Sequence, residues 1–370
     1  MSRNVSRREA LEMIGAVVAF AGAARADAPV FEKGAVIRTV LKDYAPQDLG
    51  GGATLFHEHM SLAPDFMPRW TAQYRKTLEE NGSLPAGRGR AGAAPARGEA
   101  PGLFFMQDVA FMTEEMKQAK ADGIACIVDG GHADMGRDIG FLKKISEGSG
   151  LPIVSGGGFY THPFYPPEIA TWSETQIFEA LLKQAETDPI GAFGEIGSWD
   201  WITADERKVF RAVGRAHVAT NLPIFTHTGI PGKSAMEQLD LLEDAGVKPN
   251  RVVIGHLGNL VDPKVEIQKA ICRRGAFIGF DRQGGPGDAQ QVPMVMSLIE
   301  AGFAGNLMFS ADLSSRAQTK QGGGAGYAKT LTVFVPKVKA AGASDEVLHG
   351  IMVDNPRRFL AFVPKKGRKR

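Results

Sequence analysis

The sequence predicts an α/β protein of the (β/α)8 TIM barrel class, and three observations support this. Eight short β-rich runs recur along the chain, at residues 53–57, 124–129, 152–156, 190–195, 222–227, 251–256, 276–280 and 306–311. Amphipathic stretches with a helical period lie between them, including 174–186, 204–219, 235–245 and 263–273. A length of 370 residues suits one such barrel with insertions. Regular alternation of strand and helix favours parallel strands closed into a barrel.

Polar side chains stand where the predicted strands end. Strands one, four, five, six and eight each lead into one or two of them: His57, His59, Glu195, His227, His256 and Asp312. In a (β/α)8 barrel the active site lies at the C-terminal ends of the strands. These six side chains are therefore expected to share one site.

The chemistry of these side chains indicates metal binding. His57 and His59 are two residues apart on a strand and point to the same face, whereas Glu58 faces the other way. Imidazole and carboxylate ligands suit zinc, and also cobalt, manganese or iron. Six ligands exceed the needs of one tetrahedral ion. We therefore predict two divalent metal ions, zinc first among them, bridged by a carboxylate.

Charge and cysteine content exclude other classes. The chain has 43 basic and 41 acidic residues, so no strong overall field favours a nucleic-acid partner. Its only cysteines, Cys126 and Cys272, lie in apolar segments and are expected to be buried hydrophobic residues rather than a disulfide framework.

The chain ends carry separate signals. An Arg7-Arg8 pair, an apolar stretch over 13–24 and the small-residue sequence 24–26 predict a twin-arginine export signal over 1–26, with an amphipathic helix as the alternative. The apolar stretch is too short for a permanent membrane anchor. We expect a periplasmic or extracellular protein with a single hydrolase barrel over 27–363 and a basic tail over 364–370.

Two stretches interrupt the strand and helix alternation. Residues 81–102 are mostly Gly, Ala, Pro and Arg, which predicts a flexible insertion after strand one. Residues 321–326 form a Gly-rich loop after strand eight, either a lid or a spacer. Aromatic residues after strands three and four could line a substrate wall or pack loops onto the barrel: Phe159, Phe164, Tyr165, Trp172, Trp199 and Trp201.

The ordered ligand set resembles the phosphotriesterase family of the amidohydrolase superfamily, over roughly residues 51–360. Segments 136–139, 158–160 and 279–282 match the family's segments in the same order. The resemblance implies one metal held by His57, His59 and Asp312, an outer metal held by His227 and His256, and Glu195 as the bridge. The best-known members have a carbamylated lysine where this chain has Glu195, as in the phosphotriesterase-homology branch. Glutamate also supplies an anionic pair of oxygens that can bridge two ions. The exchange of lysine for glutamate therefore leaves the expected metal centre unchanged and affects the expected substrate.

The resemblance also implies a mechanism. A hydroxide bridging the two metals would attack the substrate, the outer metal would act as a Lewis acid, and Asp312 would accept the proton. Tyr160 and Arg282 match the lactonase branch, where a phenol and a guanidinium stabilise an oxyanion. The alternative for Tyr160 is an aromatic residue at the rim.

We therefore expect a metal-dependent hydrolase of lactones or carboxylic esters, with organophosphate triester hydrolysis as a side activity. The alternatives are a true organophosphate triesterase and an amide or N-acyl amino acid hydrolase. A non-enzymatic alternative is an exported metal- or ligand-binding protein. The expected partner is a small-molecule substrate. The family resemblance also implies that the protein forms a homodimer.

Overall fold

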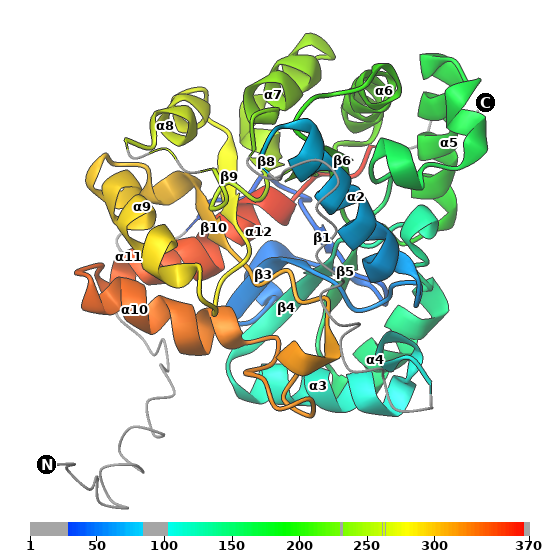
Figure 1. Cartoon of the computed structure of the whole chain (residues 1–370). Coiled ribbons are helices and arrows are strands. Elements are labelled where there is room, and N and C mark those ends of the chain that lie inside the picture. The colour runs from blue at the N-terminus through cyan, green and yellow to red at the C-terminus, as the bar shows by residue number, and fades with distance from the viewer. Residues whose placement is uncertain (1–28, 84–102, 230–231, 261, 263, 366–370) are drawn as a thin grey trace, which may run out of the picture.

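The computed structural model describes residues 29–83, 103–229, 232–260, 262 and 264–365. The eight predicted strands are confirmed and run in parallel: β3 (Ala53–Glu58), β4 (Ile124–Asp129), β5 (Ile153–Ser155), β6 (Phe193–Ser198), β7 (Ile224–Thr228), β8 (Val252–Ile254), β9 (Phe277–Phe280) and β10 (Leu307–Phe309). They form a three-stranded sheet, β3-β4-β5, and a five-stranded sheet, β6 to β10. Figure 1 shows them at the centre of a ring of helices.

Two seams join these sheets into a TIM barrel. At the first, Ser155, the last residue of β5, forms a parallel bridge with Ile190 ahead of β6. At the second, the Ser310 hydroxyl after β10 donates a 2.6 Å hydrogen bond to the carbonyl of His57 on β3. The backbone N–H of His57 donates to the same hydroxyl over 3.1 Å. The second seam therefore lies at the level of the predicted ligands.

Helices follow the strands and cover the barrel: α2 (Phe66–Glu80), α3 (Val109–Ala121), α4 (Ile139–Ser149), α5 (Glu174–Thr187), α6 (Ala204–Thr220), α7 (Ala235–Asp244), α8 (Glu266–Arg273), α9 (Asp288–Glu300), α10 (Val335–Ala340), α11 (Asp345–His349) and α12 (Asn355–Leu360). Ser173 and Thr203 form capping boxes that fix the starts of α5 and α6. The helix predicted from residue 263 begins at Glu266, because Val265 is left-handed and the Asp262 carboxylate accepts from the Glu266 backbone N–H.

Helix α2 was not predicted. Phe66, Trp70, Tyr74 and Thr77 recur at three- and four-residue spacing and place one face against the barrel. The sequence after it is rich in Gly and Ala, which obscured the helical pattern. Residues 84–102 of the predicted insertion, the predicted export signal and residues 366–370 of the basic tail lie outside the described residues.

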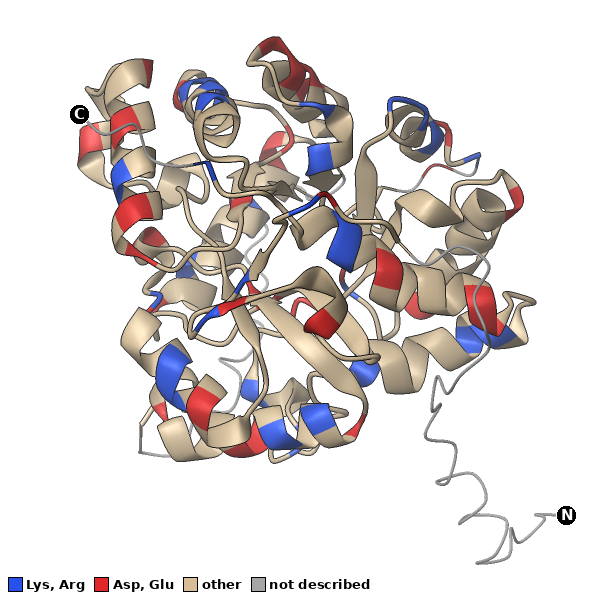
Figure 2. Cartoon of the chain, turned by 180° about the vertical axis from the view of Figure 1, so that it is seen from behind, with Lys and Arg blue, Asp and Glu red and all other residues tan. Residues whose placement is uncertain are grey.

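The end of the barrel opposite the site is filled by apolar residues. The antiparallel strands β1 (Ile37–Arg38) and β2 (Asp43–Tyr44) contribute Ile37 and pack with Phe359 and Leu360 of α12 against the barrel interior. Cys126 lies in this interior and Cys272 in α8; both are free and buried, as predicted. Figure 2, from behind, shows basic and acidic residues interspersed over the outer helices. Within the described part of the chain, every helix is too short or too polar to cross a bilayer.

The Gly-rich loop at 321–326 is anchored to α3. The carboxylate of Glu115 on α3 accepts from the backbone N–H groups of Lys320 and Gln321, over 3.0 and 2.8 Å. The Gln321 side-chain amide donates to the carbonyl of Phe111, over 2.9 Å. These bonds favour the spacer interpretation over the lid.

Candidate metal centre and pocket

The four predicted histidine ligands surround the carboxylate of Glu195 at the mouth of the barrel. Glu195 Oε1 lies 3.1 Å from His59 Nε2. Its Oε2 lies 3.2 Å from His57 Nε2 and 2.9 Å from His227 Nδ1. The same oxygen lies 3.4 Å from His256 Nε2. All five side chains are buried, so one carboxylate is shared by four imidazoles in a site shielded from solvent.

Asp312 joins this cluster from the loop after β10. Its Oδ1 lies 3.2 Å from His59 Nε2, and its Oδ2 accepts a 2.9 Å hydrogen bond from Arg282 Nε. The backbone of Asp312 is left-handed, with φ of 49°. The guanidinium therefore orients the carboxylate, and the six residues predicted to share a site do lie together.

Asp281 is a functional candidate that the sequence reasoning missed. Its carboxylate lies 3.0 Å from His57 Nδ1 and 2.8 Å from His256 Nδ1, and it also accepts from the His256 backbone N–H. These contacts leave the Nε2 atoms of both imidazoles facing Glu195. A carboxylate on the far nitrogen of a histidine is typical around metal sites. Asp281 directly follows β9, so the strand-end rule that identified the other candidates could have found it.

Glu58 faces away from His57, as predicted, and organises the loop that carries Asp312. Its carboxylate accepts from the Ser310 hydroxyl over 2.8 Å. It also accepts from the backbone N–H groups of Ala311, over 2.7 Å, and Leu313, over 2.8 Å. Burial raises the pKa of Glu58 to about 7, against these hydrogen bonds. Glu58 thus connects the first barrel strand to the residues on either side of Asp312.

The electrostatics of the cluster favour bound cations. Burial opposes charge on Glu195, but the imidazoles of His57 and His227 hold its pKa well below the usual range. Burial likewise opposes protonation of His59, yet hydrogen bonds to Asp312 and Glu195 raise its pKa to about 10. The buried carboxylates of Glu195 and Asp312 are therefore stabilised by nearby positive charge, which protons or metal ions can supply.

The donor atoms fit two ions. Potential metal-binding groups whose ligand atoms lie within 4.8 Å of one another include His57, His59 and Glu195, and separately Glu195, His227 and His256. The two groups share Glu195. Among the described residues, the buried His57 Nε2 has no hydrogen-bond partner. Nitrogen and carboxylate oxygen donors in this arrangement match divalent transition metals.

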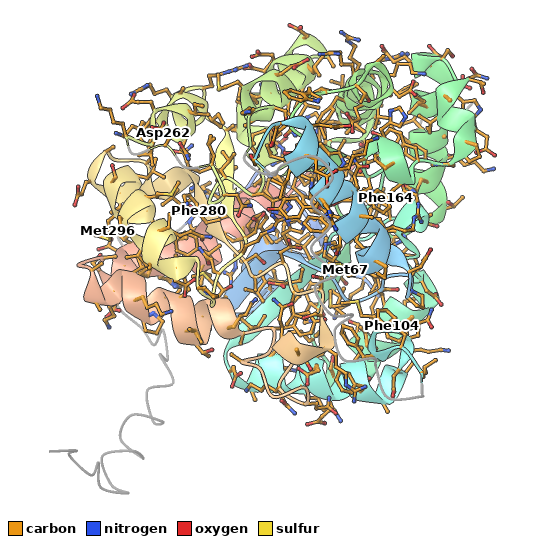
Figure 3. The ribbon with its side chains drawn as sticks, in the orientation of Figure 1. Met67, Phe104, Phe164, Asp262, Phe280 and Met296 are labelled. Atoms are coloured by element: carbon orange, nitrogen blue, oxygen red, sulfur yellow. The ribbon has the colours of Figure 1, made fainter. Side chains whose placement is uncertain are left out.

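A cavity of about 370 Å³ opens above the cluster. His59, Glu195, His227 and Asp312 form its polar base. Helix α2 supplies an apolar wall: Phe66, Met67 and Trp70. Figure 3 labels Met67 on α2, at the mouth of the barrel. Arg282, Gln283 and Lys329 also line the cavity, and the guanidinium carbon of Arg282 lies 5.6 Å from the centre of the Trp70 ring.

The apolar wall therefore does not come from the six aromatic residues considered in the sequence. None of them lines the cavity. Phe164 packs behind Phe66 and Tyr160, and Trp199 packs behind Trp70, so these two hold loops and α2 on the barrel. Trp201 is exposed.

Tyr160 lies in the wall of the cavity beside the cluster. Its side chain is buried, and its hydroxyl lies 3.1 Å from His227 Nδ1. Trp70 Nε1 donates a 3.0 Å hydrogen bond to the same hydroxyl. Burial, reinforced by the charges of Glu195 and Asp312, raises the pKa of Tyr160 well above its usual range. The residue therefore carries a neutral hydroxyl within the pocket.

Comparison with known proteins identifies the family. A model of the phosphotriesterase family matches residues 36–360. The chain belongs to the phosphotriesterase family. Together with the ligand groups around Glu195, this membership makes the chain a metal-dependent hydrolase.

Similar members of the phosphotriesterase family differ in their named activities. N-acetyltaurine hydrolase from Xenopus tropicalis is 27% identical over 88% of this chain and 98% of its own length. The phosphotriesterase homology protein of Escherichia coli (strain K12) is 31% identical over 69% of this chain and 90% of its own. The crystal structure of a resiniferatoxin-binding protein from Rhodobacter sphaeroides has a TM-score of 0.75, with 27% identity, covering 90% of this chain and 97% of that one.

Proposed function

We propose that this phosphotriesterase-family hydrolase cleaves lactone or carboxylic ester bonds at a binuclear metal centre. The observation that carries the proposal is that Tyr160 and Arg282 line one cavity together with Glu195 and Asp312. A phenol and a guanidinium beside the reaction centre can stabilise the oxyanion that forms when a carbonyl is attacked.

The geometry supports the ligand assignment that the family resemblance implies. His57, His59 and Asp312 would hold one ion and His227 and His256 the other, with Glu195 between them. When bound, two divalent cations acidify a water molecule to the hydroxide nucleophile and polarise the scissile carbonyl. Zinc suits this donor set, as do cobalt, manganese and iron.

The remaining roles belong to the protein's own side chains. Asp312 would accept the nucleophile's proton on its carboxylate, and the hydrogen bond from Arg282 that orients this carboxylate supports the role. The hydroxyl of Tyr160 accepts from Trp70, so its own proton remains available for the developing oxyanion. The apolar wall of α2 limits the access of bulk water.

Amide hydrolysis is the second candidate, and a specific observation favours it. The relatives named N-acetyltaurine hydrolase align with most of this chain. An amide requires a proton at its leaving nitrogen, and Asp312 could return the proton it has accepted. Phosphotriester hydrolysis is proposed only as a side activity.

The test compares kcat/KM of the metal-loaded protein for lactones, carboxylic esters, N-acyl amino compounds and an activated phosphotriester. Glu195→Ala is the background control, since it removes the shared ligand. Lactones or esters are expected to exceed the other classes by orders of magnitude. Faster amide turnover would establish the second candidate, and a preference for the triester would refute the role given to Tyr160 and Arg282. No turnover of any class would favour the binding-protein alternative.

A further inference from the structure

Lys329 is a buried cation in the wall of the cavity. It is 7% exposed and lies directly before the π-helix η9 (Thr330–Phe334). Among the residues that the structure describes, its ammonium has no hydrogen-bond or ion-pair partner, and the ammonium nitrogen is not one of the fully enclosed polar atoms, so it reaches the cavity. A charge on a side chain that is largely removed from water is stabilised by a partner of opposite charge. Lys329 is therefore suited to a partner that enters the cavity.

The acidic side chains around Lys329 are already engaged. Three carboxylates attract it electrostatically: Glu58, Asp312 and Asp288. Glu58 is occupied by the backbone after β10, and Asp312 by the guanidinium described above. Asp288 accepts a 2.6 Å bond from Lys337 Nζ. None of the three is free to form a close ion pair with Lys329.

Gln283 provides an independent sign of a missing ligand. Its side chain is 1% exposed and lines the same cavity, yet within the described part of the chain neither Nε2 nor Oε1 has a hydrogen-bond partner. The neighbouring Arg282 Nη1 is also buried without a partner. Buried polar groups are normally satisfied, so the free N–H donors of Gln283 Nε2 and Arg282 Nη1 point to an acceptor that a ligand brings.

The backbone places these donors on one wall. Gly284 is left-handed, with φ of +78°, and a Cβ there would lie 2.9 Å from Cγ of Lys329. The lysine stem therefore lies directly against the residue that follows Gln283. The apolar face of α2 lines the same cavity, so the cavity combines cationic and apolar side chains.

We propose that Lys329 and Gln283 form a subsite for a singly charged oxyanion, a carboxylate or a sulfonate, carried by the substrate. This inference rests on the proposed function and narrows its substrate to anionic esters or amides. An ammonium and an amide N–H both donate to such oxygens, and charge-assisted bonds of this kind are strong. Neutral lactones and phosphotriesters leave the subsite unused.

The test uses substrates that share one scissile bond and differ in charge. The ester series is monomethyl succinate, methyl 3-sulfopropanoate and dimethyl succinate; the amide series is N-acetyl-β-alanine and its primary amide. Each is assayed with wild type, Lys329→Met and Gln283→Leu. The two anionic esters distinguish a carboxylate from a sulfonate. Lys339→Met is the matched control, because it removes the same charge from α10, where Lys339 pairs with Asp345 at the surface.

Wild type is expected to prefer the anionic members. Lys329→Met should lower the anionic-to-neutral ratio of kcat/KM by about 10- to 100-fold, mainly through KM. Gln283→Leu should lower it less, and Lys339→Met should leave it unchanged. The melting temperature of Lys329→Met should stay the same or rise, because an unpaired buried charge is removed; a structural role would lower it.

Two results would overturn the subsite: a wild-type preference for the neutral members, or an equal loss on both members in Lys329→Met. If wild type turns over neither series, calorimetry with succinate decides the subsite alone, and the proposed function fails only if lactones are not turned over either. Binding to wild type that is lost in Lys329→Met supports it, and the absence of binding to wild type refutes it.

Discussion

Trp70 donates a hydrogen bond from its indole Nε1–H to the hydroxyl oxygen of Tyr160, over 3.0 Å. A phenol that accepts on one side presents its own proton elsewhere, here toward His227 and the cavity. Stacking on Tyr74 and contact with Trp199 hold the indole in place. Helix α2 therefore sets the direction of the one neutral donor that the proposed mechanism uses.

Trp70→Phe should keep the apolar wall but remove the hydrogen bond that orients the Tyr160 hydroxyl. We expect kcat for esters or lactones to fall about 2- to 10-fold, the usual scale for one hydrogen bond, and Tyr160→Phe to cost about 10²- to 10³-fold. Steady-state kinetics on both variants and on the double variant provide the measurement. Trp70→Phe should add nothing in the Tyr160→Phe background, and a further additive loss would contradict the positioning role. Tyr74→Phe, on the same helix, is the control.

Asp312→Asn tests the proton acceptor. The amide keeps the shape of the side chain but cannot accept a proton at neutral pH, so kcat should fall by about 10²- to 10⁴-fold. Metal content must be measured alongside, because Asp312 is also a proposed ligand. Near-normal turnover in a variant that still holds two ions would remove the proton-acceptor role.

Metal binding should release protons. Hydrogen bonds to Asp312 and Glu195 raise the pKa of His59 to about 10 against the effect of burial, so at neutral pH its imidazole must lose a proton to become a ligand. Affinity for zinc should therefore rise with pH, and a chelator should abolish activity. Calorimetry between pH 6.5 and 8, in buffers of different ionisation enthalpy, measures the protons released. An affinity that is constant over this range would contradict the site.

Asp281→Asn tests the carboxylate behind the histidines. Loss of its charge weakens the contacts that aim His57 and His256 at Glu195. Metal affinity should fall by about 10- to 100-fold, measured by competition with a chromogenic chelator. Asp262→Asn makes the same change at the start of α8 and should leave metal affinity intact. Equal affinities in the two variants would show that Asp281 has no part in orienting the ligands.

His217 should make stability depend on pH independently of the metal centre. Burial lowers its pKa to about 4, and its Nδ1 lies 2.7 Å from the carbonyl of Leu222. The unfolded chain binds this proton near pH 6.5 but the folded chain only near pH 4. Neutral His217 therefore makes its full contribution to the free energy of unfolding above pH 6.5. This contribution is lost as the pH falls toward 4, by up to about 1.4 kcal/mol per pH unit.

Urea unfolding of wild type and His217→Gln at pH 7.5, 6 and 5 measures this contribution. The free energy of unfolding of wild type should fall more steeply toward pH 5 than that of the variant. Parallel curves would show that His217 does not titrate as its burial indicates.

Local sequence pattern was sufficient for the barrel and for the six proposed ligands. Buried strands such as Ile124–Asp129 are continuous apolar runs, and barrel geometry brings the ends of all such strands to one face. The contacts of Asp281 and Lys329 were not predictable in this way. They depend on how loops after β9 and β10 pack against each other, which no local period encodes. Helix α2 was not predicted because its helical spacing of apolar residues is followed directly by a stretch without large apolar residues.

The carboxylate of Glu58 ties the first strand of the barrel to the loop after the last, across more than 250 positions of sequence. Contacts of such high sequence separation form late in folding, since the intervening chain must be ordered first. During synthesis, the ligands before residue 300 emerge well ahead of Asp312. A nascent or C-terminally clipped chain would therefore lack one ligand and the clamp that positions it. Closure of the barrel and completion of the proposed ligand set are therefore the same event in folding.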